Sequence, residues 1–291
     1  MKIAATVQGA YIAIAVRLAA CLALAQPQSP AWHEGFVDVP GAKLFYRDSG
    51  GSGIPVVFLH ALTGSAEVWE HQIPAFTGAG YRFIAYDRRG FGRTIADPNG
   101  PASTGPDDLL ALVDYLKIEK FHLVGTAAGG FVALDFVISY PSRLRSFVLL
   151  CSQGRVQDPD FLEAIKRLSP DGFTNLPPYF RELAPSYRVS NPDGVARWSE
   201  FEKKSRAPQA VQGLAQPSKN RVTLALIERV RVPALVIAGD ADPYAPPPLM
   251  RRIAERIKGA QFVVFPEAGH SAWWESPDTF NRTVLEFIRP H

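Results

Sequence analysis

One short segment carries the strongest structural signal in this chain: Phe121-His122-Leu123-Val124-Gly125-Thr126-Ala127-Ala128-Gly129-Gly130-Phe131. Residues 121–125 form an apolar run typical of a buried strand, and residues 129–140 have helical spacing and end before Pro141. The residues between them are small, which indicates a sharp turn in which larger side chains would collide. The segment therefore predicts a strand, a tight turn and a helix, with Ala127 at the centre of the turn.

Outward from this segment, the chain alternates between apolar runs and helical patterns. This alternation predicts an α/β fold in which a mostly parallel sheet is covered by helices on both faces. The expected strands are residues 35–39, 43–48, 55–60, 81–87, 121–125, 145–152, 233–239 and 261–265, and the expected helices are residues 107–116, 129–140, 247–257 and 277–288.

Five motifs follow one another in a fixed order, and together they make residues 36–288 resemble the α/β-hydrolase superfamily. They are His60-Ala61-Leu62-Thr63-Gly64, Asp87-Arg88-Arg89-Gly90-Phe91-Gly92, the turn at 125–129, Gly239-Asp240-Ala241-Asp242, and Gly269-His270 followed by Glu275-Ser276-Pro277 and Phe280-Asn281. The resemblance implies the α/β-hydrolase fold, with a mostly parallel eight-stranded sheet flanked by helices and a helical lid insertion. It also implies that the turn residue at position 127 is raised above the sheet on a strained elbow.

The chain departs from this family at the elbow itself. Ala127 stands where the family has Ser, Cys or Asp, and a methyl group cannot attack a carbonyl. Thr126 would replace the nucleophile only if the elbow were displaced by one residue. Ala127 is either native, which we expect, or a laboratory replacement of a nucleophile.

The other catalytic positions of the family are occupied. The resemblance makes His270 the general base and Asp242 the carboxylate that orients it, with Asp240 as the competing acid. The backbone N–H groups of Leu62 and Ala128 would form an oxyanion hole, with support from the dipole of the helix that follows.

Further residues adjoin these motifs and are expected in the substrate pocket. They are His60, Ala61 (where the family has Gly), Thr126, Tyr244 and Trp273. We expect Asp87 and Arg88 to hold loops together, Glu275 to order the last turn, and Cys151 to be a small buried apolar residue.

Residues 153–229 interrupt the alternation between two core strands. They contain helical fragments, several prolines and seven aromatic residues, so we expect a lid over the carboxyl edge of the sheet, where open α/β folds bind ligands. A packed helical excursion is the alternative. The expected core is residues 35–152 and 230–291.

The composition is that of a globular protein, with 47% hydrophobic and 20% charged residues. A net charge of +3 gives no reason to expect a nucleic-acid partner. Two cysteines and the absence of a ligand cluster or dinucleotide-binding loop in the sequence imply no metal and no organic cofactor. We expect a small-molecule substrate, and the sequence gives no prediction of oligomeric state.

The first residues have the pattern of a targeting segment. Residues 1–25 combine a positive start, an apolar stretch and the small-residue site Ala23-Leu24-Ala25, which predicts a signal peptide followed by a linker at residues 26–34. We therefore expect export to the periplasm or the medium. Cys21 in Leu18-Ala19-Ala20-Cys21 leaves a lipoprotein anchor as the alternative, and the polar interruptions argue against a stable membrane span.

Three functions fit this sequence. The first is an enzyme in which His270 activates water against an ester, a lactone or an activated C–C bond of a small apolar substrate. The second is a lyase-type enzyme in which His270 abstracts a proton from the substrate. The third is a catalytically silent binding protein, which would have no physical need to retain both His270 and Asp242.

Overall fold

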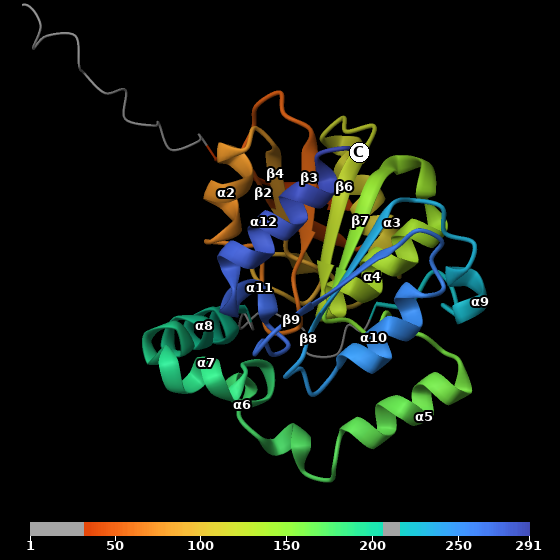
Figure 1. The fold of residues 1–291 in the computed structure, drawn as a ribbon. Coiled ribbons are helices and arrows are strands. Elements are labelled where there is room, and N and C mark those ends of the chain that lie inside the picture. Colours follow the sequence, from red (N-terminus) through yellow and green to blue (C-terminus); the bar gives the residue numbers. More distant parts are fainter. Residues whose placement is uncertain (1–31, 206–215) are drawn as a thin grey trace, which may run out of the picture. The chain divides into compact units, whose positions relative to one another are not determined.

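A nine-stranded sheet forms the centre of the protein, as a computed structural model describes it for residues 32–205 and 216–291 (Figure 1). Eight strands follow the order β1-β2-β4-β3-β6-β7-β8-β9, and the two-residue strand β5 pairs with β2 at the side. The expected eight strands are therefore all present, and β5 is an addition. Their bounds are β1 His33–Val39, β2 Ala42–Asp48, β3 Pro55–Leu59, β4 Arg82–Tyr86, β5 Ile95–Ala96, β6 Phe121–Thr126, β7 Leu144–Leu150, β8 Ala234–Gly239 and β9 Gln261–Phe265.

The pairing of the strands decides where the loops meet. β1, β2 and β4 pair antiparallel, whereas all pairs along β4-β3-β6-β7-β8-β9 are parallel. The carboxyl ends of parallel strands lie at one edge of a sheet. The loops that follow β3, β4, β6, β7, β8 and β9 therefore share this edge. They contain the first four motifs and Gly269-His270 of the fifth.

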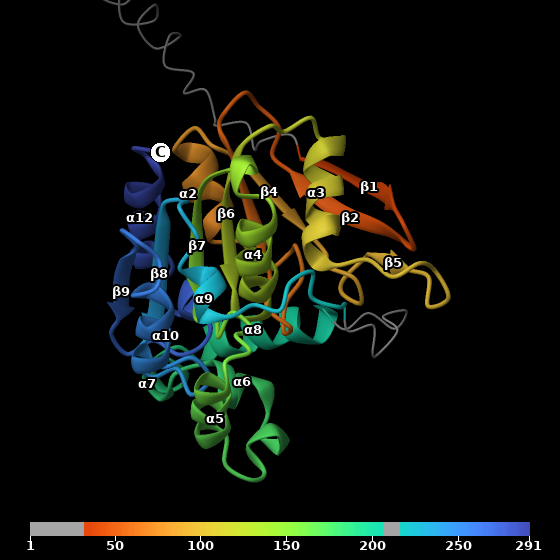
Figure 2. The ribbon, with the colours of Figure 1, turned by 90° about the vertical axis from the view of Figure 1, so that its right-hand side faces the viewer.

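Helices cover both faces of the sheet (Figure 2). One face packs against α3 Gly105–Tyr115, α4 Ala127–Ser139, α9 Leu224–Ile227 and α10 Pro247–Ala254, and the other against α2 Gln72–Gly78, α11 Ala272–Glu275 and α12 Pro277–Ile288. The four helices expected from the sequence are present, and α2 and α11 were not expected.

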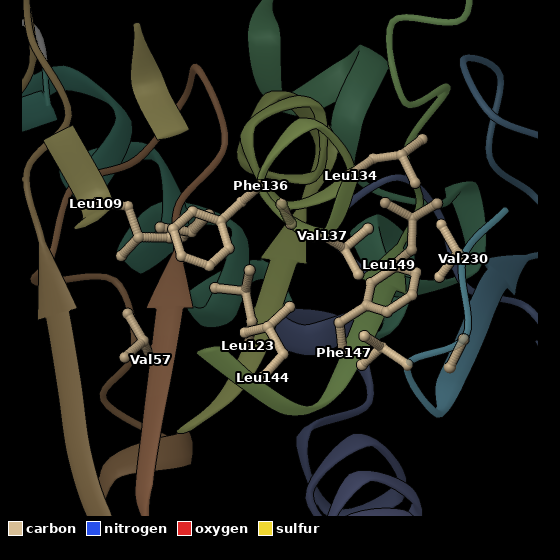
Figure 3. Close-up of a cluster of buried hydrophobic side chains, with 14 of the residues drawn as sticks. Val57, Leu109, Leu123, Leu134, Phe136, Val137, Leu144, Phe147, Leu149 and Val230 are labelled. Carbon is tan, nitrogen blue, oxygen red and sulfur yellow. The ribbon is translucent and has the colours of Figure 1, made fainter. Parts of the chain in front are cut away.

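Alternating side chains on the central strands build the two hydrophobic cores. Leu123 of β6 and Phe147 of β7 are fully buried against the α4 face, while their neighbours Val124 and Val148 are fully buried against the opposite face. Figure 3 shows the first core, in which Phe136 from α4 packs over these strands. Because both faces are covered, the central strands β3 and β8 are apolar along their whole length.

Several helices of the segment between β7 and β8 lie beyond the carboxyl ends of the strands (Figures 1 and 2). They are α5 Pro159–Leu168, α6 Pro178–Glu182, α7 Pro185–Ser190 and α8 Pro192–Ser205. Hydrogen bonds between this insert and the residues that follow β9 include Ser271 N–H to the Glu182 carbonyl (3.1 Å) and Ala184 N–H to the Glu275 carboxylate (2.9 Å).

The expected signal peptide, most of the linker and Cys21 fall outside the described residues. Within residues 32–205 and 216–291, no helix is long and apolar enough to cross a membrane. The same residues contain no group of three or more metal-ligating side chains.

Candidate active site

The turn after β6 has the backbone geometry of a strained elbow. β6 ends at Thr126 and α4 begins at Ala127, whose φ of 49° lies in the left-handed region that residues with a Cβ rarely adopt. The chain can turn this sharply because Gly129 has no side chain: an added Cβ would lie 2.2 Å from the Leu59 carbonyl oxygen. Ala127 is therefore the elbow residue.

Thr126 lies on the other side of this turn. Its side chain is fully buried, and its hydroxyl has no hydrogen-bond partner among the residues that the structure describes. It does not line the cavity beside the elbow. The alternative of an elbow displaced onto Thr126 is therefore wrong, and so is its expected place in the pocket.

His270 and Asp242 form a buried pair at the same edge of the sheet. The His270 Nδ1 atom lies 2.9 and 2.8 Å from the two carboxylate oxygens of Asp242, so this nitrogen donates its proton to the carboxylate. Asp242 Oδ1 also accepts hydrogen bonds from the backbone N–H groups of Tyr244 (2.8 Å) and Ala245 (3.1 Å), which hold it in place. Asp240, the competing acid, is exposed to solvent.

The charges around His270 favour its protonated form. Burial lowers the pKa of His270. The carboxylates of Asp242, Glu182 and Glu275 raise this pKa by more than burial lowers it, so that it reaches about 9. Burial raises the pKa of Glu182, which the neighbouring His270 partly offsets. The site is therefore arranged to stabilise an imidazolium ion.

A cavity of about 240 Å³ brings the elbow and the His270–Asp242 pair together. His270 lines one side of it, Ala127 and Ala128 line the base of the elbow, and Tyr244 lies beside His270 with the ring centres 4.5 Å apart. The remaining lining residues are Leu62, Thr63, Phe131, Cys151, Ser152, Gln153, Arg181 and Glu182.

Two predicted oxyanion-hole residues line this cavity. Ala128 lies in the first turn of α4, and Leu62 lies in the loop after β3. The first N–H groups of a helix have no partner within it and carry its positive dipole end. Both residues therefore lie at the same cavity as His270.

Three further residues expected in the pocket do not line it. His60 is fully buried, with its Nε2 accepting from the Arg88 N–H (3.0 Å) and its Nδ1 donating to the Ala61 carbonyl (2.7 Å). Burial and the nearby Arg88 lower the pKa of His60 well below its usual value, so it is a neutral brace for the loop that it begins. Ala61 is buried in that loop, and Trp273 packs against Trp69 in the core.

Glu275 joins two segments of the chain, and Cys151 has a buried thiol. Glu275 accepts hydrogen bonds from the backbone N–H groups of Gly269 (3.0 Å) and Ala184 (2.9 Å), so it joins the histidine loop to the insert and does more than order the last turn. Cys151 is fully buried, and burial raises the pKa of its thiol well above the usual range. The thiol is therefore held in its unreactive protonated form.

Arg181 and Glu182 are cavity residues that the sequence did not indicate. They end α6 in the insert and reach the cavity from the side opposite the sheet. The Arg181 Nη1 atom donates to the Tyr244 hydroxyl (2.5 Å), while Glu182 Oε2 is buried and, in the described part of the chain, has no hydrogen-bond partner. Nothing in the local sequence distinguishes these two residues from surface charges.

Residues 56–283 match the model of the Alpha/beta hydrolase family. A protein of Mycobacterium tuberculosis named "Putative non-heme bromoperoxidase BpoC" is 31% identical over 253 residues, which are 83% of this chain and 96% of that protein. A 2-hydroxy-6-oxononadienedioate/2-hydroxy-6-oxononatrienedioate hydrolase of Paraburkholderia phymatum is 29% identical over 271 residues, covering 84% of this chain and 91% of that enzyme.

Solved structures share the same architecture. A thermophilic esterase from Thermogutta terrifontis superimposes with a TM-score of 0.70 and 26% identity, over 89% of this chain and 98% of the esterase. A hydrolase from Pseudomonas aeruginosa gives a TM-score of 0.73, also with 26% identity, over 88% of this chain and 98% of that chain. The fold thus has counterparts in solved proteins named as an esterase and as a hydrolase.

Proposed function

The chain belongs to the α/β hydrolase family, and we propose that it hydrolyses an ester, a lactone or an activated C–C bond of a small substrate by direct attack of water. The observation that carries this proposal is that His270, paired with Asp242, lines the same cavity as Ala127 and Ala128. The pair argues for proton transfer, and the Ala127 methyl argues against a covalent intermediate at the elbow.

The proposed reaction begins with the neutral form of His270. Its Nε2 atom takes a proton from a water molecule while the water oxygen bonds to the substrate carbonyl carbon, and the carbonyl π electrons move onto oxygen. The N–H groups of Leu62 and Ala128 donate to this oxyanion, and Asp242 stabilises the imidazolium. The tetrahedral intermediate then collapses: the oxyanion electrons reform the carbonyl, the bond to the leaving group breaks, and His270 returns the proton to the leaving group.

The rate of such an enzyme is expected to be modest. Serine hydrolases that lose their nucleophile still accelerate hydrolysis by roughly 10³–10⁴-fold over water, through the oxyanion hole and substrate binding. Because the Ala127 side chain has no hydroxyl, none competes with a water molecule for the position next to His270 Nε2. We expect this chain to reach or exceed that residual acceleration.

We propose that helices α5–α8 act as the lid of this site. Support comes from α6, because its residues Arg181 and Glu182 line the same cavity as Ala127. The hydrogen bonds from Ser271 and Ala184 across the two segments connect the lid to the histidine loop. A substrate held between them would be screened from solvent, which strengthens every electrostatic interaction in the site.

A substrate screen of the purified protein tests the proposal, with His270→Ala as the control. Esters, lactones and β-diketones are offered, and we expect turnover of at least one class by the native chain and none by the variant. Turnover that His270→Ala retains would refute the role of His270. Absence of turnover together with tight ligand binding by both proteins would favour a binding protein.

Labelled water separates hydrolysis from lyase chemistry. In water enriched with oxygen-18, hydrolysis places the label in the acid product because the attacking oxygen comes from solvent. A lyase reaction initiated by proton abstraction at His270 gives unlabelled product. We expect one labelled oxygen per turnover.

A further inference from the structure

A second cavity of about 300 Å³ adjoins the active-site cavity. The two share the lining residues Leu62, Ala128 and Phe131, so they form neighbouring compartments on either side of the proposed oxyanion hole. Apolar residues of α3 and α4, including Pro106 and Val132, line the second compartment. A substrate that reaches the active site could extend into this compartment.

Most charged groups on this second wall already have partners. Arg89 forms a two-pronged ion pair with Asp108, with Nε 2.7 Å and Nη2 2.8 Å from its carboxylate oxygens. The Asp135 carboxylate accepts hydrogen bonds from the backbone N–H groups of Lys219 (2.7 Å) and Asn220 (3.1 Å). These groups stabilise the fold and have little capacity left for a ligand.

Arg88 is different, because it is a buried cation without a countercharge in the part of the chain that the structure describes. Its side chain lines the second cavity and only 7% of the residue is exposed. Nη2 donates to the Ala61 carbonyl (3.2 Å) and the guanidinium lies 4.8 Å from the centre of the Phe91 ring, but Nε has no hydrogen-bond partner within residues 32–205 and 216–291. Among the described residues Arg88 makes no ion pair, and residues 1–31 and 206–215 contain no Asp or Glu in their sequence.

A buried charge of this kind is unfavourable unless something compensates it. Burial lowers the pKa of Arg88 to about 10, so the guanidinium keeps its charge at neutral pH. Bracing the Ala61 carbonyl uses one of its five N–H donors, and a neutral side chain could do the same. The remaining donors and the charge fit an anion that arrives with the ligand.

We propose that Arg88 binds a carboxylate group of the substrate, whose scissile carbonyl lies at the other side of Leu62 and Ala128. The planar guanidinium matches a carboxylate in shape and charge, and one buried cation balances the single charge of a carboxylate better than the double charge of a phosphate dianion. The apolar wall of Phe131 and Val132 suits the chain that joins the two groups. This assignment deepens the proposed hydrolase function, and the position of the scissile carbonyl rests on that function. Binding of a carboxylate at Arg88 can be tested without turnover.

Calorimetric titration with hexanoate and hexanamide tests this site, because the two probes share their alkyl chain and differ in charge. We expect native protein to bind hexanoate at least about tenfold more tightly than hexanamide, and Arg88→Met to reduce this preference to less than twofold. Arg88→Lys keeps the charge and should retain part of the preference. Arg155→Gln, which removes an exposed cation from the same cavity, should change it little.

Equal binding of the two probes by native protein, or no binding of hexanoate, would overturn the proposal. So would an unchanged preference in Arg88→Met or an equal loss in Arg155→Gln. If Arg88→Met fails to fold, NMR of the native protein provides the test. The signal of the Arg88 Nε–H is assigned by its absence in Arg88→Lys, and we expect it to shift on addition of hexanoate. A signal that does not move refutes the site. Hexanoate binding that persists in a protein without hydrolase activity would refute only the proposed function.

Discussion

The imidazole of His270 and the carboxylate of Asp242 meet through one ring nitrogen, with Nδ1 2.9 and 2.8 Å from the two oxygens. This contact leaves Nε2 as the nitrogen that can exchange protons with a ligand. We expect His270→Ala to lower kcat by at least about 100-fold, because a positioned general base contributes on that scale. Steady-state kinetics on the best substrate from the screen measures the loss.

A histidine far from the cavity provides the control for that loss. His33 is exposed on β1, so His33→Ala should leave kcat within about twofold of the native value. Asp242→Asn should also lower kcat strongly, because the amide no longer stabilises the imidazolium. Equal activities of the native protein and either active-site variant would contradict the role of the pair.

Glu182 should shift the pH dependence of the reaction. The reaction requires neutral His270, whose pKa is about 9, so kcat/KM should rise with pH until about pH 9. Glu182→Gln removes one of the carboxylates that raise this pKa, so the rising limb should move to lower pH, on the order of one unit. A pH profile of kcat/KM for both proteins measures the shift.

Glu163 provides a matched substitution for this experiment. It is exposed on α5 and distant from the cavity lining, so Glu163→Gln should leave the profile unchanged. A profile for Glu182→Gln that coincides with the native one, or moves to higher pH, would show that Glu182 does not act on His270.

Ala127→Ser should convert the site to covalent catalysis. The left-handed backbone at position 127 would present the new hydroxyl in the cavity that contains His270. We expect hydrolysis of p-nitrophenyl butyrate to increase by at least about 100-fold, since nucleophile and base act as a unit in serine hydrolases. Ala128→Ser, one residue further along α4, should give no comparable gain, and an unimproved Ala127→Ser would argue against an aligned base and oxyanion hole.

Glu275 should contribute to stability through the two N–H groups that it accepts. Glu275→Ala leaves the Gly269 and Ala184 donors without their partner, which should lower the free energy of unfolding by about 1–3 kcal/mol. Urea denaturation monitored by circular dichroism measures the change. Glu286→Ala, on the exposed side of α12, should cost less than about 0.5 kcal/mol, and a similar effect of both substitutions would contradict the bridging role.

Much of the fold was predictable because its strands are short, apolar and bounded by Gly or Pro. β8, with Pro233 before it and Gly239 at its end, was expected almost to the residue. Helix α2 escaped prediction because Pro74 and Gly78 weaken its helical pattern, and α11 is only four residues long. The extra strand β5 depends on its pairing with β2 and has too few residues for a pattern.

The site was predictable where a motif specifies the course of the backbone. It was less predictable where the direction of a side chain decides whether a residue lines the cavity. The choice of Asp242 over Asp240 followed from loop spacing, and the structure pairs Asp242 with His270. His60 was expected in the pocket because it begins the loop after β3, but its ring turns inward to brace that loop. Glu182 reaches the cavity only through the packing of the insert, which leaves no local signature in the sequence.

The central claim is hydrolysis without a covalent intermediate, and intact-protein mass spectrometry of rapidly quenched reactions tests it most directly. With p-nitrophenyl butyrate under turnover, Ala127→Ser should accumulate a butyryl adduct that shows the method can detect one. Native protein should release product with no added mass at any time point. A butyryl adduct on the native chain that forms and decays at the rate of turnover, whether on Thr126, Cys151 or His270, would contradict the account.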